Sequence, residues 1–63
     1  IMVVKEFDRV ILKTGEMAYI ADVIVPSKAY VVDIDQSDGT IETMVAEQED
    51  IEQVVGSKTV QSA

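Results

Sequence analysis

The sequence predicts an all-β domain, a small barrel or sandwich built from five short strands. Two observations lead to this fold class. Apolar runs rich in β-branched residues recur at intervals of roughly ten residues, which is typical of small all-β folds. Turn-forming clusters separate these runs: Thr14-Gly15-Glu16, Pro26-Ser27-Lys28 and Gln36-Ser37-Asp38-Gly39.

The predicted strands account for most of the chain. They cover residues 7–13, 17–25, 29–35, 40–46 and 51–55. Residues 47–50, Glu-Gln-Glu-Asp, are poor strand formers and predict one short turn of 3₁₀ or α helix before the last strand. We therefore expect a single domain over residues 1–55, followed by a polar C-terminal tail over residues 56–63.

Period-two alternation separates a core face from an outward face on each predicted strand. Within residues 29–35, Tyr30, Val32 and Ile34 share one parity, and Asp33 and Asp35 take the other. The predicted core is the set of apolar residues of inward parity: Val10, Leu12, Ile20, Tyr30, Val32, Ile34, Ile41 and Val45. Phe7 is expected to join them, as the second aromatic side chain of the core.

Asp22 interrupts the alternation of the second strand. The parity of Ala18 and Ile20 would carry Asp22 into the core, where an unpaired carboxylate is too costly to bury. Val23 belongs to the opposite parity. A bulge or sharp bend near Ala21-Asp22 would reverse the facing and keep Asp22 in water.

Composition argues against several function classes. The chain has twelve Asp and Glu against five Lys and Arg, a formal charge of −7, and no His, Cys or Trp. This net negative charge repels phosphate, and the basic side chains are scattered along the chain. We therefore expect no binding of nucleic acid. Without His or Cys, the hydroxyl and lysine nucleophiles have no base suitably spaced, so we expect no enzyme activity and no cofactor.

The same composition bears on location. No apolar run approaches the length of a membrane span, so we expect no association with a membrane. The absence of cysteine fits a reducing compartment. We therefore expect a cytoplasmic protein.

Several segments give the chain a resemblance to a known family. They are residues 7–12 leading to Gly15, residues 18–23, residues 29–34, and Asp50-Ile51 before a last apolar pair. These segments resemble a family of short bacterial proteins of unknown function, which is similar to a stand-alone SH3-like barrel and distantly KOW-like in shape. Over residues 5–55 the resemblance implies a five-stranded SH3-like barrel. Ala18 stands where a KOW pattern has glycine, and the RNA-contacting basic residues are missing, so no activity is implied.

The acidic segment over residues 33–42 matches a calcium-binding loop only in part. If Gly39 takes the glycine position of that loop, Ile34 occupies the first ligand position. If Asp33 is the first ligand, Asp38 replaces the glycine. We therefore predict no metal site of this type and interpret the segment as a hairpin whose Asp-Gly turn uses positive φ.

This hairpin supplies the predicted binding face. A loop of two or four residues would place Glu42 opposite Asp35 or Asp33, a repulsive pair, with Val31 and Met44 on the same face. We predict a non-enzymatic protein-protein interaction module whose partner has a basic rim and contacts Val31, Asp33, Asp35, Glu42 and Met44. The alternative is a small-ligand or divalent-cation-binding domain that uses Asp33, Asp35 and Glu42. A solvated strand face without function also stays open. We further expect a homodimer formed through an edge strand.

Overall fold

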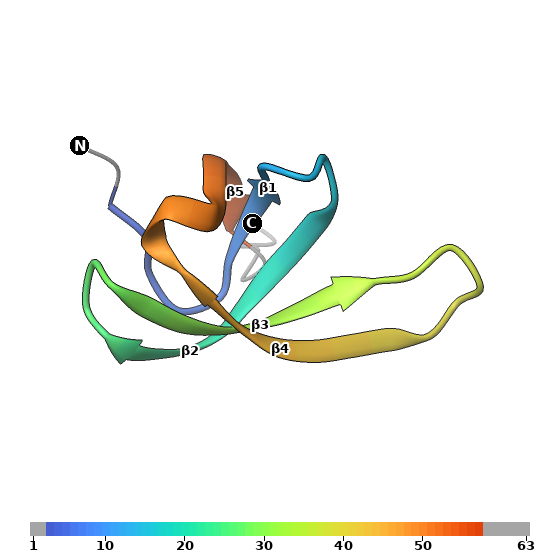
Figure 1. Ribbon diagram of the computed structural model, residues 1–63, viewed down its shortest axis with the longest axis horizontal. Coiled ribbons are helices and arrows are strands. Elements are labelled where there is room, and N and C mark those ends of the chain that lie inside the picture. Colours follow the sequence, from blue (N-terminus) through green and yellow to red (C-terminus); the bar gives the residue numbers. More distant parts are fainter. Residues whose placement is uncertain (1–2, 58–63) are drawn as a thin grey trace, which may run out of the picture.

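The computed structural model describes residues 3–57 and confirms the all-β class (Figure 1). Its strands are β1 (Asp8–Leu12), β2 (Met17–Val25), β3 (Ala29–Asp35), β4 (Ile41–Glu47) and β5 (Ile51–Ser57). They form one antiparallel sheet in the order β4-β3-β2-β1-β5, so β4 and β5 are its edges. No helix in the described part of the chain is long and apolar enough to span a membrane.

The short helical turn is present where the composition predicted it. This 3₁₀ turn, η1 (Gln48–Asp50), lies between β4 and β5. Its first turn is closed by Asp50, whose Oδ2 accepts a hydrogen bond of 2.9 Å from the Glu47 N–H. The last strand is longer than predicted, because Gly56 and Ser57 belong to β5. The remainder of the predicted tail, residues 58–63, lies outside the described residues.

Two of the hairpins close through the same kind of loop. In the β3–β4 hairpin, the Gln36 N–H donates to the Thr40 carbonyl at 2.8 Å, and the Gly39 N–H donates to the Gln36 carbonyl at 3.1 Å. This leaves a loop of three residues, Ser37-Asp38-Gly39, with glycine in the third position at φ 91°. Gly15 takes the same place in the β1–β2 hairpin, at φ 95°.

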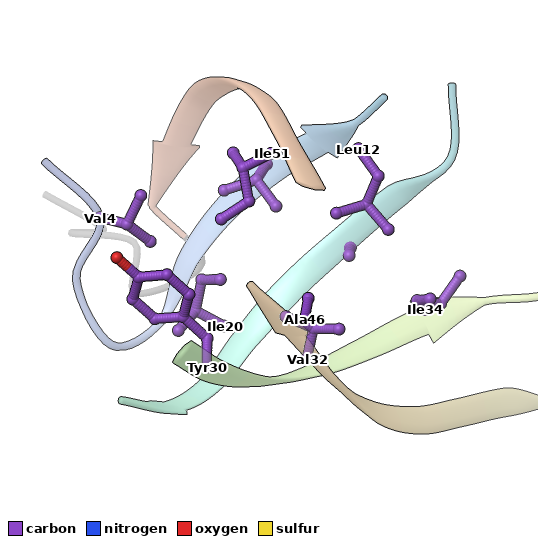
Figure 2. Packing of buried hydrophobic residues seen from close by; sticks show 10 residues of the cluster. Val4, Leu12, Ile20, Tyr30, Val32, Ile34, Ala46 and Ile51 are labelled. Carbon is purple, nitrogen blue, oxygen red and sulfur yellow. The ribbon is translucent and has the colours of Figure 1, made fainter. Parts of the chain in front are cut away.

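A core of aliphatic side chains and one tyrosine lies inside the curve of the sheet (Figure 2). Its buried members are Val4, Val10, Leu12, Ala18, Ile20, Tyr30, Val32, Ile34, Ala46 and Ile51. Six of the eight predicted core residues are among them, which confirms the facing of β1, β2 and β3. Tyr30 also ties the core to η1, because its hydroxyl donates to Oε1 of Gln48.

Three predicted core residues are exposed instead. Ile41 and Val45 are each 62% exposed, and the residue of β4 that is buried is Ala46. A loop of three residues, rather than two or four, shifts the register by one position and exchanges the faces of β4. Phe7 is 47% exposed, since its φ of 73° takes it out of the alternation of β1.

The bulge predicted in β2 is confirmed. Ile20 lies opposite Val32, and Asp22 lies opposite Val31, so Ala21 is the extra residue on β2. Asp22 is exposed as a result, and Val23 packs against the core. The cost of burying one carboxylate is therefore enough to locate a backbone irregularity from sequence.

Candidate functional site

The candidate functional site is the edge strand β4. Among the described strands, β4 pairs with β3 alone, and its other edge carries no strand. All its side chains except that of Ala46 are exposed. An edge strand also presents a row of backbone N–H and C=O groups that a further chain can pair with. Within residues 3–57, β4 thus combines backbone groups that no other strand pairs with and exposed apolar side chains.

The register of β3 and β4 divides the predicted binding residues between two faces. Residues directly opposite each other in a ladder share a face, and Glu42 lies opposite Ile34, while Met44 lies opposite Val32. The prediction that Glu42 faces Asp35 or Asp33 is therefore wrong. The five predicted residues form two sets: Val31, Asp33 and Asp35 on the outward face, and Glu42 and Met44 on the core side.

On the outward face, carboxylates and apolar side chains occupy different strands. Val31 lies opposite Val45, Asp33 opposite Thr43, and Asp35 opposite Ile41. The Thr43 hydroxyl donates a hydrogen bond of 2.7 Å to Oδ1 of Asp33 across the pair. The acids therefore line β3, one strand in from the edge, and Ile41 and Val45 lie at the edge itself.

The hydrogen-bond pattern of the ladder places backbone groups at this edge. The Gln36 N–H donates to the Thr40 carbonyl, so these two residues form a hydrogen-bonded pair at the end of the ladder. In an antiparallel ladder, hydrogen-bonded and non-hydrogen-bonded pairs alternate. Ile41, Thr43 and Val45 therefore fall in non-hydrogen-bonded pairs, and their N–H and C=O groups face away from β3.

The core side of β4 borders a shallow groove. Gln36 donates from Nε2 to Oε1 of Glu42 at 3.0 Å, which holds this carboxylate near the hairpin tip. Met44 is 42% exposed and lines a groove of about 290 Å³. The groove is also lined by Leu12, Lys13, Ile34 and Asp50. Its floor is apolar and its rim is charged with both signs.

The carboxylates proposed for cation binding do not come together. Asp33 and Asp35 lie on the outward face, and Glu42 lies on the core side. No group of three or more Asp or Glu side chains within residues 3–57 is arranged to hold a metal ion. The geometry therefore does not favour the alternative function as a cation-binding domain.

Asp38 is engaged within the hairpin loop. The Thr40 hydroxyl and the Thr40 N–H both donate to Oδ1 of Asp38, at 2.7 and 3.0 Å. These bonds hold the pKa of Asp38 below its ordinary value of 3.8, with the hydroxyl as the larger cause. The carboxylate thus stabilises the turn that sets the register of β4.

Sequence reasoning missed Ile41, Thr43 and Val45 as surface residues. The signal that could have located them is Gly39, because glycine in the third position is typical of a three-residue hairpin loop. Reasoning also missed Asp8, a carboxylate only 7% exposed, which accepts a hydrogen bond of 2.8 Å from the Lys5 N–H. Asp8 closes a turn before β1 and contributes nothing to the site.

Comparisons with known proteins supply no further assignment. No family model, curated protein or solved structure matches the chain.

Proposed function

We propose that this protein is a non-enzymatic interaction module that acts in the cytoplasm and that its protein partner docks along β4. The observation that carries the proposal is the coincidence of two features on one strand. Ile41 and Val45 are each 62% exposed, and their backbone groups face the free edge of the sheet. Pairing with another chain would satisfy those backbone groups and bury the side chains together.

The charge of the chain supports a protein partner over a nucleic acid. At a formal charge of −7, the chain as a whole repels the phosphates of a nucleic acid. On the outward face, Asp33 and Asp35 lie directly behind the apolar edge of β4. This arrangement suits a backbone-pairing protein segment whose side chains meet Ile41 and Val45 first.

The proposal includes an SH3-like barrel of the short bacterial family that the sequence resembles. The strand order β4-β3-β2-β1-β5 and the 3₁₀ turn before β5 support it. So does the curvature of the sheet, which is visible in Figure 1. The hydroxyl of Tyr30, a core residue, donates a hydrogen bond to Gln48 of η1. Fold likeness does not decide function, so the docking strand rests on the features of β4 alone.

The test compares matched valine-to-lysine substitutions on the two edge strands. The domain is immobilised and used to capture partners from an extract of the native host, with quantitative mass spectrometry. Val45→Lys on β4 should remove the captured partners, because a lysine interrupts both the apolar contact and the pairing of an edge. Val55→Lys on β5 makes the same change in charge and should retain them. Equal capture by both variants would rule out β4 as the docking strand.

A further inference from the structure

We infer that the chain that pairs with β4 is a second copy of this protein, aligned antiparallel around a two-fold axis at Thr43. The inference rests on the proposed function, since it takes β4 as the docking strand and names its occupant. The free edge displays the side chains and backbone groups of Ile41, Thr43 and Val45. That pattern, apolar, threonine, apolar, reads the same in both directions.

Symmetry limits the registers in which two copies can pair. A two-fold axis perpendicular to the sheet does not turn either copy over, so residues that lie opposite each other must point to the same face. The axis must therefore run midway between one residue and the same residue of the partner copy, and not between two successive residues. The axis at the middle of β4 therefore passes through Glu42, Thr43 or Met44. In each case the backbone groups of β4 that face the free edge meet those of the partner copy.

The register centred on Thr43 gives the best set of opposing side chains. Ile41 lies opposite the partner's Val45, and this apolar pair forms twice. Thr43 lies opposite itself, and threonine pairs are favourable across strands. On the core side, Glu42 lies opposite the partner's Met44, so no carboxylate directly faces another.

The two neighbouring registers are worse. An axis through Glu42 sets two carboxylates directly opposite each other, which is destabilising. An axis through Met44 places Ile41 opposite the partner's Glu47, and an apolar side chain then gains no apolar partner. Thr43 is thus the centre that the side chains of β4 select.

β4 also lacks several of the devices that keep edge strands apart, and its only charged side chains are Glu42 and Glu47. Its sequence, IETMVAE, contains no lysine, proline or glycine, and its ladder with β3 runs without a bulge. The net charge of −7 on each copy is the main term that opposes association. Salt screens that repulsion, so self-association should strengthen as salt rises from about 0.1 M to about 1 M. A partner with a basic surface would bind more weakly under the same change.

The first measurement is sedimentation of the full chain at about 100 μM across that salt range. A dimer that becomes tighter with salt is expected, and Val45→Lys should weaken it at least about tenfold. Val55→Lys makes the same change in net charge and should not weaken it. A wild-type monomer at every salt concentration overturns the inference. If Val45→Lys still abolishes capture from extract in that case, β4 remains the docking strand and only its occupant is wrong.

The second measurement fixes the register with single cysteines, which the chain otherwise lacks. Thr43→Cys places two Cα atoms about 5.5 Å apart across the axis, within the span of a disulfide. Val45→Cys is the matched control, because the two copies of residue 45 lie four positions apart, about 14 Å. Rapid oxidative cross-linking of Thr43→Cys alone supports the register. Cross-linking of Val45→Cys at an equal rate overturns it.

Discussion

The two edges of the sheet are built differently, although each is a strand of seven residues. β5 is joined to β1 with two register shifts, and Ile51 anchors its start in the core at 1% exposure. β4 runs along β3 with no shift, and its buried residue is the small Ala46. Bulges twist an edge away from further pairing, so β5 is protected, whereas β4 has no bulge along β3.

The contrast separates two roles that edge strands can have. β5 contributes a large buried side chain and therefore stabilises the fold. β4 keeps Ile41 and Val45 in water, where they add little to the stability of a single chain. Substitutions on the two strands should accordingly divide into those that unfold the protein and those that alter its association.

The largest expected effect tests this division directly. Ile51→Ala on β5 should cost about 2 to 5 kcal/mol, because it opens a cavity in the core. A domain of this size has little stability in excess of about 5 kcal/mol, so much of the variant should be unfolded. Ile41→Ala on β4 should change the free energy of unfolding by at most about 0.5 kcal/mol. Urea denaturation followed by circular dichroism measures both, and equal costs would contradict the observed register of β4.

The next effect tests which backbone groups of β4 face the free edge. Met44 alternates with the edge-facing residues, so its N–H belongs to the ladder with β3. Met44→Pro removes that donor and leaves a carbonyl of β3 without its partner. Val45→Pro removes an N–H that faces the free edge of β4 instead. We expect Met44→Pro to be less stable than Val45→Pro by about 1 to 3 kcal/mol in thermal or urea unfolding. The reverse order would mean that the alternation is displaced by one residue.

The sequence predicted the fold where one physical cost outweighed the others. The bulge at Ala21 followed from the price of burying Asp22, and the core of β3 followed from the alternation of Tyr30, Val32 and Ile34. The turn at η1 followed from a segment of poor strand formers. In each case a wrong structure would have buried a charge or exposed a whole apolar face.

The candidate site was less predictable, because β4 has apolar residues on both faces. Ile41 and Val45 carry one face, and Met44 and Ala46 carry the other, so alternation alone does not choose between them. The choice depends on whether the loop at Ser37-Asp38-Gly39 has an even or an odd number of residues. A single miscounted loop residue therefore exchanged the core and surface of the whole strand.

A smaller effect tests that loop and its counterpart in the β1–β2 hairpin. Gly39 and Gly15 have φ of 91° and 95°, and neither has an atom within 4 Å of an added Cβ. Gly39→Ala and Gly15→Ala should therefore each cost about 1 kcal/mol through backbone strain alone. Gly39→Ala alone should also weaken self-association, since its loop sets the register of β4. Equal dimer dissociation constants for the two variants in sedimentation would contradict this role.

The smallest effect concerns Asp38, at the tip of the hairpin that carries β4 to the edge. Its pKa lies below 3.8 in the folded chain because the Thr40 hydroxyl, and then the Thr40 N–H, donate to the charged form. A carboxyl whose pKa is lowered by folding stabilises the fold at pH values above the pKa that it has in the unfolded chain. That contribution is lost as the pH falls through the lower folded pKa, so acid should loosen this hairpin.

Thr40→Val isolates the hydroxyl. The pKa of Asp38, followed by the carboxyl carbon shift in a nuclear magnetic resonance titration, should rise toward 3.8 and remain below it, because the Thr40 N–H still donates. Thr43→Val removes the hydroxyl that bonds Asp33 instead, so it should leave the pKa of Asp38 where it was. If both variants shift Asp38 equally, the loop is held by something other than Thr40. The register of β4 would then depend on Gly39 and the ladder with β3 alone.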